Sequence, residues 1–160
     1  MANIIRFGGG TGSGSSSAGE NTELEIIIRD FGDGRGIYKN EDASYIGDYA
    51  FYCCVGLTSV SFPNVDTISS YAFSGCEDLT SVDFPKLSTI YDNAFLDCTS
   101  LTSVTMGSPS KVVTLVNSNA FDGTPIADGN GVIYVNRHLI DSYKTATNWK
   151  QFANLFKEIY

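Results

Sequence analysis

The sequence has little of the chemistry on which most enzymes and nucleic-acid-binding proteins depend. It contains one histidine, one tryptophan, and 10 Lys and Arg against 18 Asp and Glu, for a formal net charge of −8. Phosphate backbones attract positive surfaces, so this balance argues against a nucleic-acid partner. Anionic membrane surfaces are disfavoured for the same reason. No apolar run approaches the roughly 18 residues of a membrane span, so no membrane insertion is expected.

Catalytic and metal-binding patterns are missing as well. His138 has no second His or Cys at ligand spacing, and the serines recur as strand residues rather than beside a base. The segment Gly8–Gly12 lacks the Gly-Lys-Ser/Thr ending of a phosphate-binding loop. The segment Asp30–Gly36 lacks most of a calcium-loop pattern and is better explained as a turn. The sequence therefore predicts no enzyme activity, no cofactor and no bound metal.

One sequence pattern occurs three times between Ile46 and Met106, at a spacing of 22 residues. It reads I-x-x-x-A-F-x-x-C-x-x-L-T-S-V-x-F-P and is less complete in its third copy. A fixed period of roughly 20–29 residues with leucine-like positions indicates a leucine-rich solenoid. The part Leu-Thr-Ser-Val-x-Phe predicts a short strand, with Leu57, Val60 and Phe62 facing inward, that ends at the following proline. The apolar spacing of Ile-x-x-x-Ala-Phe-x-x-Cys predicts a short helical or 3₁₀ arc.

The predicted fold is thus an α/β solenoid with parallel strands, short helical arcs and a C-terminal helical cap. Caps are needed because the end repeats of a solenoid would otherwise expose its core. We divide the chain into an N-terminal anchor peptide and Gly/Ser tether (1–20), an N-terminal cap (21–45), repeats (46–124) and a C-terminal cap with the last strand and helices (125–160). The strand-like segment Glu23–Asp30 is expected to cover the first repeat.

The period breaks after Met106. The distance from Ala94 to Ala120 is 26 residues, so four extra residues form a longer loop near 107–113. In this fourth copy, Thr124-Pro125 stands where the cysteine would be.

Three of the four cysteines, Cys54, Cys76 and Cys98, share one repeat position. Stacked repeats bring neighbouring Cα atoms within disulfide range, but parallel inward side chains favour a buried, reduced ladder. A serine at position 76 would place a hydroxyl there with no expected partner. Cys53 aligns with Gly75 and Asp97 and is expected outside the core.

The segment Ala-Phe-x-x-Cys-x-x-Leu-Thr-Ser-Val-x-Phe-Pro resembles the BspA-like branch of the leucine-rich repeat family. That resemblance covers about half of the chain and implies an extracellular binding or adhesion module rather than an enzyme. The C-terminal segment resembles the terminal cap of such repeats in phage and prophage proteins, with Asn136 in place of the usual proline. It carries Ile133-Tyr134-Val135, Leu139, Tyr143-Lys144, Ala146 and Asn148-Trp149. Two helical faces are expected in it, and Trp149 is interpreted as a cap anchor, with ligand stacking as the alternative.

The N-terminus has no basic start followed by an apolar stretch, so no secretory signal peptide is visible. Together with the phage-like cap, this favours a phage or prophage virion-attached protein of the tail, baseplate or capsid decoration, used for assembly or host-surface recognition. The alternative is a bacterial cell-surface adhesin fragment. The expected location is the virion, or the extracellular surface after lysis. The expected partners are other virion or cell-surface proteins, with a host surface protein, a glycan or a second copy of the chain left open.

Two sets of contact residues are predicted. The first is the N-terminal peptide with Ile4, Ile5 and Phe7, which the tether separates from the domain, unless this segment is only an expression scar or a disordered tail. The second is an arc of tyrosines around the Ala-Phe turns, because tight contacts use buried Tyr, Trp or Arg anchors. A purely core-shielding role for these tyrosines is the alternative. The arc comprises Tyr45, Tyr49, Tyr52, Tyr71 and Tyr91. The outward strand face shows only small polar residues in the three copies and is expected to bind weakly.

Overall fold

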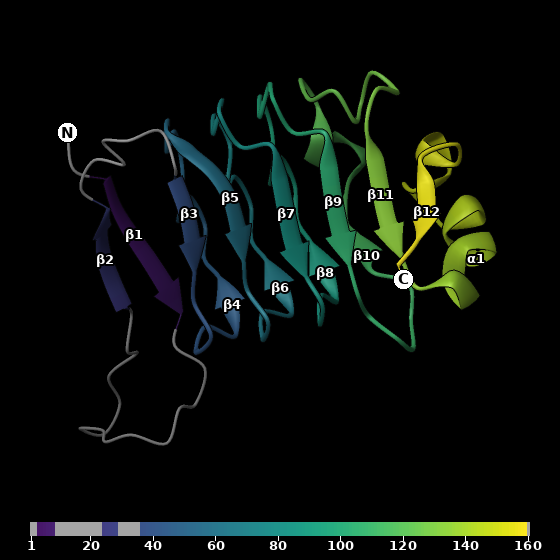
Figure 1. Cartoon of the computed structure of the whole chain (residues 1–160), viewed down its shortest axis with the longest axis horizontal. Helices are drawn as coiled ribbons and strands as arrows, with labels where there is room; N and C mark the ends of the chain where they lie inside the picture. Colours follow the sequence, from purple (N-terminus) through teal and green to yellow (C-terminus); the bar gives the residue numbers. More distant parts are fainter. Residues whose placement is uncertain (1–2, 9–23, 29–35, 160) are drawn as a thin grey trace.

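The computed structural model describes residues 3–8, 24–28 and 36–159. Its chain winds as a series of stacked coils that supply the strands of two sheets (Figure 1). One sheet, called here the long-strand sheet, takes one strand from each coil, and all its neighbouring strands are parallel. Its strands are β3 (Gly36–Lys39), β5 (Leu57–Ser61), β7 (Ser81–Phe84), β9 (Ser103–Met106), β11 (Val132–Val135) and β12 (Phe156–Glu158). The predicted α/β solenoid with parallel strands is confirmed.

The second sheet, called here the short-strand sheet, contains the parallel strands β4 (Tyr45–Ile46), β6 (Thr67–Ile68), β8 (Thr89–Ile90) and β10 (Thr114–Leu115). Two antiparallel strands, β1 (Asn3–Gly8) and β2 (Leu24–Ile28), extend it at the N-terminal end. The strand expected near residues 23–30 is present as β2, but β1 lies between it and the first repeat.

The predicted helical arcs are mostly wrong. The first apolar residue of each copy, such as Ile46, lies in a strand, and the segment that follows is a series of turns. The reason is the backbone hydrogen bonding. Alternate N–H groups reach into the next coil, as Phe51 N donates to Ala72 O at 2.6 Å, so a helix cannot use them. The N–H groups between them close turns on the residue three positions earlier.

Only the fourth copy forms a 3₁₀ helix here, η1 (Ser118–Phe121). No further turn of this kind follows it, so its N–H groups bond within the segment instead. Ala120 N donates to Asn117 O at 3.4 Å and Asp122 N donates to Asn119 O at 3.2 Å. The difference between copies therefore reflects the end of the stack rather than the local pattern.

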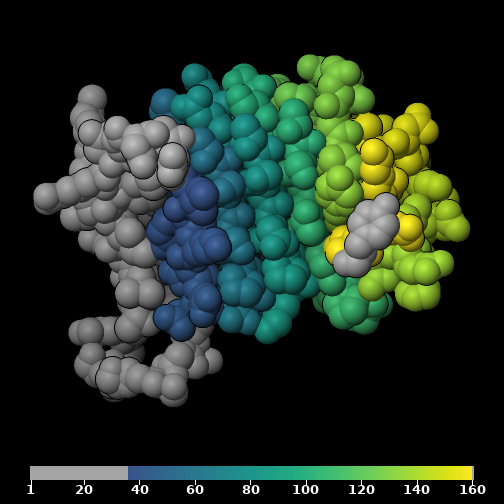
Figure 2. Space-filling model, viewed as in Figure 1, coloured from purple at the N-terminus to yellow at the C-terminus, as the bar shows by residue number. Residues whose placement is uncertain are grey.

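The core is a continuous column between the two sheets. Phe51, Phe73, Phe95 and Phe121 stack face to face, with ring centroids 4.8 to 5.3 Å apart in successive coils. Leu57, Val60 and Phe62 and their counterparts point inward, as predicted. Each aromatic ring is removed from water by the equivalent ring of the neighbouring coil, so the stability of each coil depends on its neighbours. Figure 2 shows the coils as successive bands that end in the C-terminal cap.

The C-terminal cap contains η2 (Arg137–Leu139), α1 (Ile140–Thr145), η3 (Lys150–Phe152) and β12. The second predicted helix, which was to carry Trp149 to Ile159 on one face, is wrong. Its last part is a strand because β11 offers an open parallel edge, and Phe156 pairs with Ile133 there. Trp149, Phe152 and Tyr143 are buried against the last coil, as a cap requires. Among the described residues, no helix is long and apolar enough to cross a membrane.

Candidate functional site

The outward side of the long-strand sheet, called here the strand face, presents two rows of side chains across the coils. Pairing registers place Ser59, Ser81 and Ser103 in one row, between Ile37 and Val132. The second row runs from β3 to β12. It contains Lys39, Ser61, Asp83, Thr105, Tyr134 and Lys157.

Tyr134 changes the prediction for this face. Sequence reasoning found no aromatic residue among the three copies, but β11 continues the row and sets Tyr134 opposite Thr105. Ile133 and Val135 are buried, which leaves the half-buried Tyr134 on the outward side. The alternation of inward and outward residues in Val132–Val135 indicates that Tyr134 faces outward. The extra residues before this strand prevented its alignment with the third copy from the sequence.

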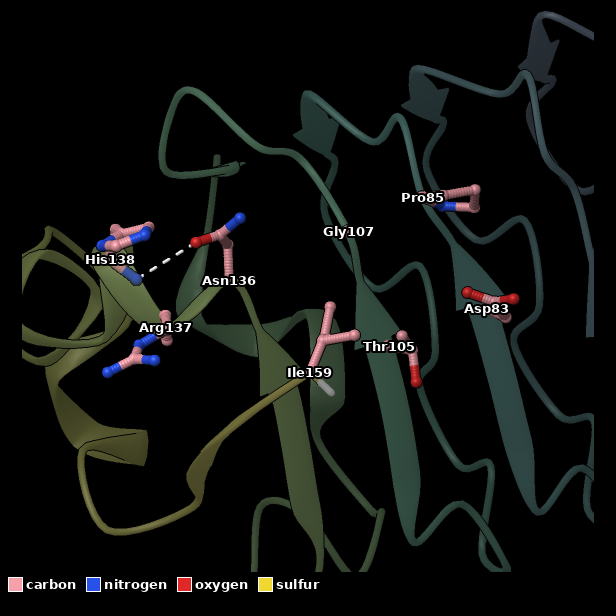
Figure 3. A pocket seen from close by; sticks show the side chains of 8 residues that line it. All are labelled: Asp83, Pro85, Thr105, Gly107, Asn136, Arg137, His138 and Ile159. Atoms are coloured by element: carbon pink, nitrogen blue, oxygen red, sulfur yellow. Dashed lines mark hydrogen bonds between the residues drawn. The ribbon is translucent and has the colours of Figure 1, made fainter.

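Two hollows of about 410 Å³ each lie on the strand face and share Asp83 and Thr105. The first covers the outward rows from β3 to β9. The second lies between β7, β9 and the loop that opens the cap (Figure 3). It is lined by Asp83, Pro85, Thr105, Gly107, Asn136, Arg137, His138 and Ile159. Sequence reasoning had placed His138 in the cap without a role, and the structure brings it to this hollow.

The cap side of the second hollow is held by a local hydrogen bond. Asn136 Oδ1 accepts from the backbone N–H of His138 at 3.1 Å, which caps η2 and fixes the loop. Gly107 lets its backbone lie close to that of Pro85, because a Cβ at position 107 would lie 2.9 Å from the Cα of Pro85. The hollow thus depends on close backbone packing between β7 and β9.

The charges of the second hollow are of both signs. Burial raises the pKa of Asp83 above its ordinary value, and no cation compensates for it among the described residues. Arg137 Nε lies 3.9 Å from Glu158 Oε2, and both side chains are exposed, so this ion pair is weak. Asp83 offers only acceptors and Arg137 only donors.

The predicted tyrosine arc is only partly brought together. Tyr49 and Tyr71 stack with ring centroids 5.0 Å apart and planes 4° apart, and Tyr52 packs on Tyr49 edge-on at 5.4 Å. Tyr49 stays 53% exposed and Tyr52 48% exposed. Tyr91 is also exposed, but the structure aligns it with Ser69 rather than with the stacked pair. Tyr45 lies in β4, away from the turns.

The predicted anchor residues Ile4, Ile5 and Phe7 lie in β1, where Phe7 is opposite Ile46. Attachment of a partner through them stays a prediction. The tether that follows, and the loop Asp30–Gly36 up to residue 35, lie outside the described residues.

All four cysteines are thiols, and Cys54, Cys76 and Cys98 are buried while Cys53 is exposed, as predicted. Cys76 Sγ donates to Phe51 O at 2.9 Å and Cys98 Sγ donates to Phe73 O at 3.0 Å. The pKa of Cys76 is raised: its hydrogen bond with Cys54 lowers it, but Cys98 and burial raise it further. Such thiols are inert. Over the part of the chain that is described, no group of His, Cys, Asp and Glu is placed to hold a metal ion.

Parallel coils with an aromatic column and one strand per coil define a leucine-rich repeat solenoid. The family model described as BspA type leucine rich repeat region (6 copies) matches residues 36–136, and the chain belongs to this family. No curated protein matches the chain.

Several solved structures are similar to this chain. A leucine-rich repeat protein from Bacteroides capillosus is 24% identical with a TM-score of 0.50, over 66% of this chain and 78% of that one. The T. pallidum leucine rich repeat protein is 24% identical with a TM-score of 0.48, over 64% of this chain and 59% of its own length. A leucine rich cell surface protein from Faecalibacterium prausnitzii is 22% identical with a TM-score of 0.41, over 56% of this chain and 31% of that one. This chain therefore spans less than two thirds of the T. pallidum and Faecalibacterium proteins.

Proposed function

We propose that this chain is a non-enzymatic binding module of a bacterial cell-surface protein of the adhesin type. Members of its family are generally binding or structural modules and are typically extracellular or on the cell surface. Neither the family nor the similar structures support the virion role expected from the C-terminal sequence. The cell-surface alternative fits them better.

The observation that carries the proposal is the stacked pair Tyr49 and Tyr71 with Tyr52 against it. The rings of Tyr49 and Tyr52 are exposed and that of Tyr71 is half-buried. The three rings hold one another in place, so little side-chain freedom is lost when a partner covers them. Val55, 62% exposed, adds apolar surface from the same coil. Rigid aromatic groups in an apolar surrounding are the usual anchors of protein contacts. We therefore assign the contact with a surface protein to this tyrosine cluster.

The test is adhesion of beads coated with the full chain to bacterial and epithelial cell layers. The double variant Tyr49→Ser with Tyr71→Ser removes the stack, and we expect most adhesion to be lost. Tyr91→Ser is the matched control, because Tyr91 is exposed but lies outside the stack. A strand-face variant, Ser61→Lys with Asp83→Lys and Thr105→Lys, serves as the comparison. Loss of adhesion only in the strand-face variant, with all proteins folded, would contradict the assignment.

A further inference from the structure

Polar side chains on the turns bridge successive coils. Asp48 accepts from Ser70 N at 3.1 Å and Asp78 accepts from Gly56 N at 3.0 Å. The strand face is different: within the described part of the chain, its outward polar side chains form no hydrogen bond or ion pair with the protein. They are Lys39, Ser59, Ser61, Ser81, Asp83, Ser103, Thr105, Tyr134 and Lys157. Their hydrogen-bonding capacity is available to a ligand.

Seven of these nine side chains line the first hollow, and Tyr134 and Lys157 continue the second row beyond it. The two hollows meet at Asp83 and Thr105, and the second reaches the cap loop (Figure 3). Parallel strands lie roughly 4.8 Å apart, so β7 and β11 are separated by about 10 Å and β3 and β12 by about 24 Å. The face is therefore long enough for a chain-like ligand that crosses the strands.

We propose that the strand face is a binding site for a neutral oligosaccharide, centred on Asp83 and Tyr134. This inference rests on the proposed binding function and adds a second site, on a different surface from the tyrosine cluster. The rows of hydroxyl groups follow the sugar chain, Asp83 and Arg137 bind pairs of adjacent sugar hydroxyls, and Tyr134 supports a ring.

The hydrogen-bonding groups suit sugar hydroxyls. A hydroxyl both donates and accepts, as do the side chains of Ser81, Ser103 and Thr105, while Asp83 accepts and Arg137 donates. A peptide would need partners for its own backbone, but the strand backbones here are engaged in the parallel ladder. It would also need apolar pockets for its side chains, and the first hollow is lined mainly by small polar residues.

The charges favour a neutral ligand over an acidic one. Asp83 occupies the junction of the hollows, and its carboxylate is already disfavoured by burial. A second negative charge beside it would be repelled at short range. Arg137 is near Glu158, and Lys39 lies two strands away from Asp83, so neither offsets that repulsion locally.

Tyr134 supplies the apolar surface that the hydroxyl rows lack. Aromatic rings with one polar tip are common where a ligand presents both apolar and polar surface. Its register position beside Thr105 puts it in the same row as Asp83, two strands further along. A ligand that bonds to Asp83 and continues toward the cap therefore passes Tyr134.

The experiment uses the purified full chain on a printed array of neutral, sialylated and sulfated oligosaccharides. Calorimetric titration with the best neutral oligosaccharide then measures affinity. We expect binding to neutral oligosaccharides, weakened at least about tenfold by Asp83→Ala and by Tyr134→Ala, and largely kept by Tyr134→Phe. The matched controls Asp128→Ala and Tyr91→Ser remove an acid and a tyrosine away from the strand face and should leave affinity unchanged. Circular dichroism and thermal melts check that each variant is folded.

Three results would overturn the inference. They are no binding to any oligosaccharide, binding to charged oligosaccharides alone, or an affinity of the folded Asp83→Ala and Tyr134→Ala variants equal to that of the unaltered protein. A loss of cell adhesion in these two variants without oligosaccharide binding would assign the face to a protein partner instead. The proposed adhesin function is judged separately, by the Tyr49 and Tyr71 double variant. Adhesion that depends on the tyrosine cluster would stand even if no sugar binds.

Discussion

Trp149 donates its indole N–H to the backbone carbonyl of Val113 at 2.6 Å, and both residues are fully buried. The N–H of the same Val113 donates to the hydroxyl of Tyr143 at 3.0 Å. Val113 ends the loop of extra residues that breaks the repeat period. The cap therefore satisfies both backbone groups of the buried residue that directly precedes β10. This confirms Trp149 as a cap anchor, because a 1% exposed ring has no surface for a ligand.

Trp149→Phe should destabilise the protein strongly. The change leaves the Val113 carbonyl buried without this donor, at a cost of about 1–3 kcal/mol, and the smaller ring leaves a cavity beside Tyr143 that adds to it. We expect the free energy of unfolding in urea to fall by about 2–5 kcal/mol. Gln151→Ala is the matched control, because Gln151 makes one exposed hydrogen bond to Ser118 O. A Trp149→Phe effect no larger than that of the control would show that the cap does not depend on this bond.

Alkaline pH should weaken the contact between the C-terminal cap and Val113. Burial raises the pKa of Tyr143 from 10.0 to about 12, although the hydrogen bond from Val113 N lowers it. The folded state thus keeps a proton that the unfolded state loses. The stabilisation is complete below pH 10 and is lost as the pH rises toward 12, in total about 3 kcal/mol for a shift of about two units.

The measurement for this prediction is the thermal midpoint of the protein and of Tyr143→Phe across that pH range. The variant starts less stable, since Val113 N loses its acceptor, but its midpoint should fall less steeply with pH. Burial also raises the pKa of Tyr38, so the thermal midpoint of both proteins should still fall somewhat with pH. Parallel curves for the two proteins would exclude Tyr143 as the source of the alkaline loss.

The repeat and its inward positions were predictable because the period is visible in the sequence itself. Phe51, Phe73 and Phe95 recur at one spacing, and a solenoid converts that spacing into a stack. The strands at Ile46 and its counterparts were not predictable in this way. Apolar residues at i, i+4, i+5 and i+8 fit a helix as well as a series of turns, and hydrogen bonds to the next coil decide between them.

The strand face was harder still to predict. Its registers through β9 follow from the period, but Tyr134 and Arg137 come after the extra residues, where the spacing no longer carries the alignment. The final strand had the apolar spacing of a helix, and only the open edge of β11 turned it into β12. The hollow shared by Asp83 and the cap loop is therefore a tertiary feature, absent from any single copy of the pattern.

The last prediction concerns the cysteine ladder. The sequence suggested that a serine at position 76 would have no partner, but the Cys76 thiol already donates to Phe51 O at 2.9 Å, so this expectation is wrong. The fourth copy has a hydroxyl at this position: buried Thr124 donates to Phe121 O of its own coil at 2.6 Å, whereas Cys76 donates to the preceding coil. Cys76→Ser should therefore cost about 1 kcal/mol, at the low end for a buried polar group.

Cys53→Ser is the matched control and should leave the unfolding free energy almost unchanged, because Cys53 is exposed. Urea unfolding compares the two variants, and maleimide labelling of the native protein compares the two thiols. Cys53 should react at once, while Cys76 should react only as the protein unfolds, since it is 0% exposed and its pKa is raised. Equal labelling rates would mean that the ladder opens in the native state, and a Cys76→Ser cost above about 3 kcal/mol would mean that the Phe51 carbonyl does not accept the serine hydroxyl.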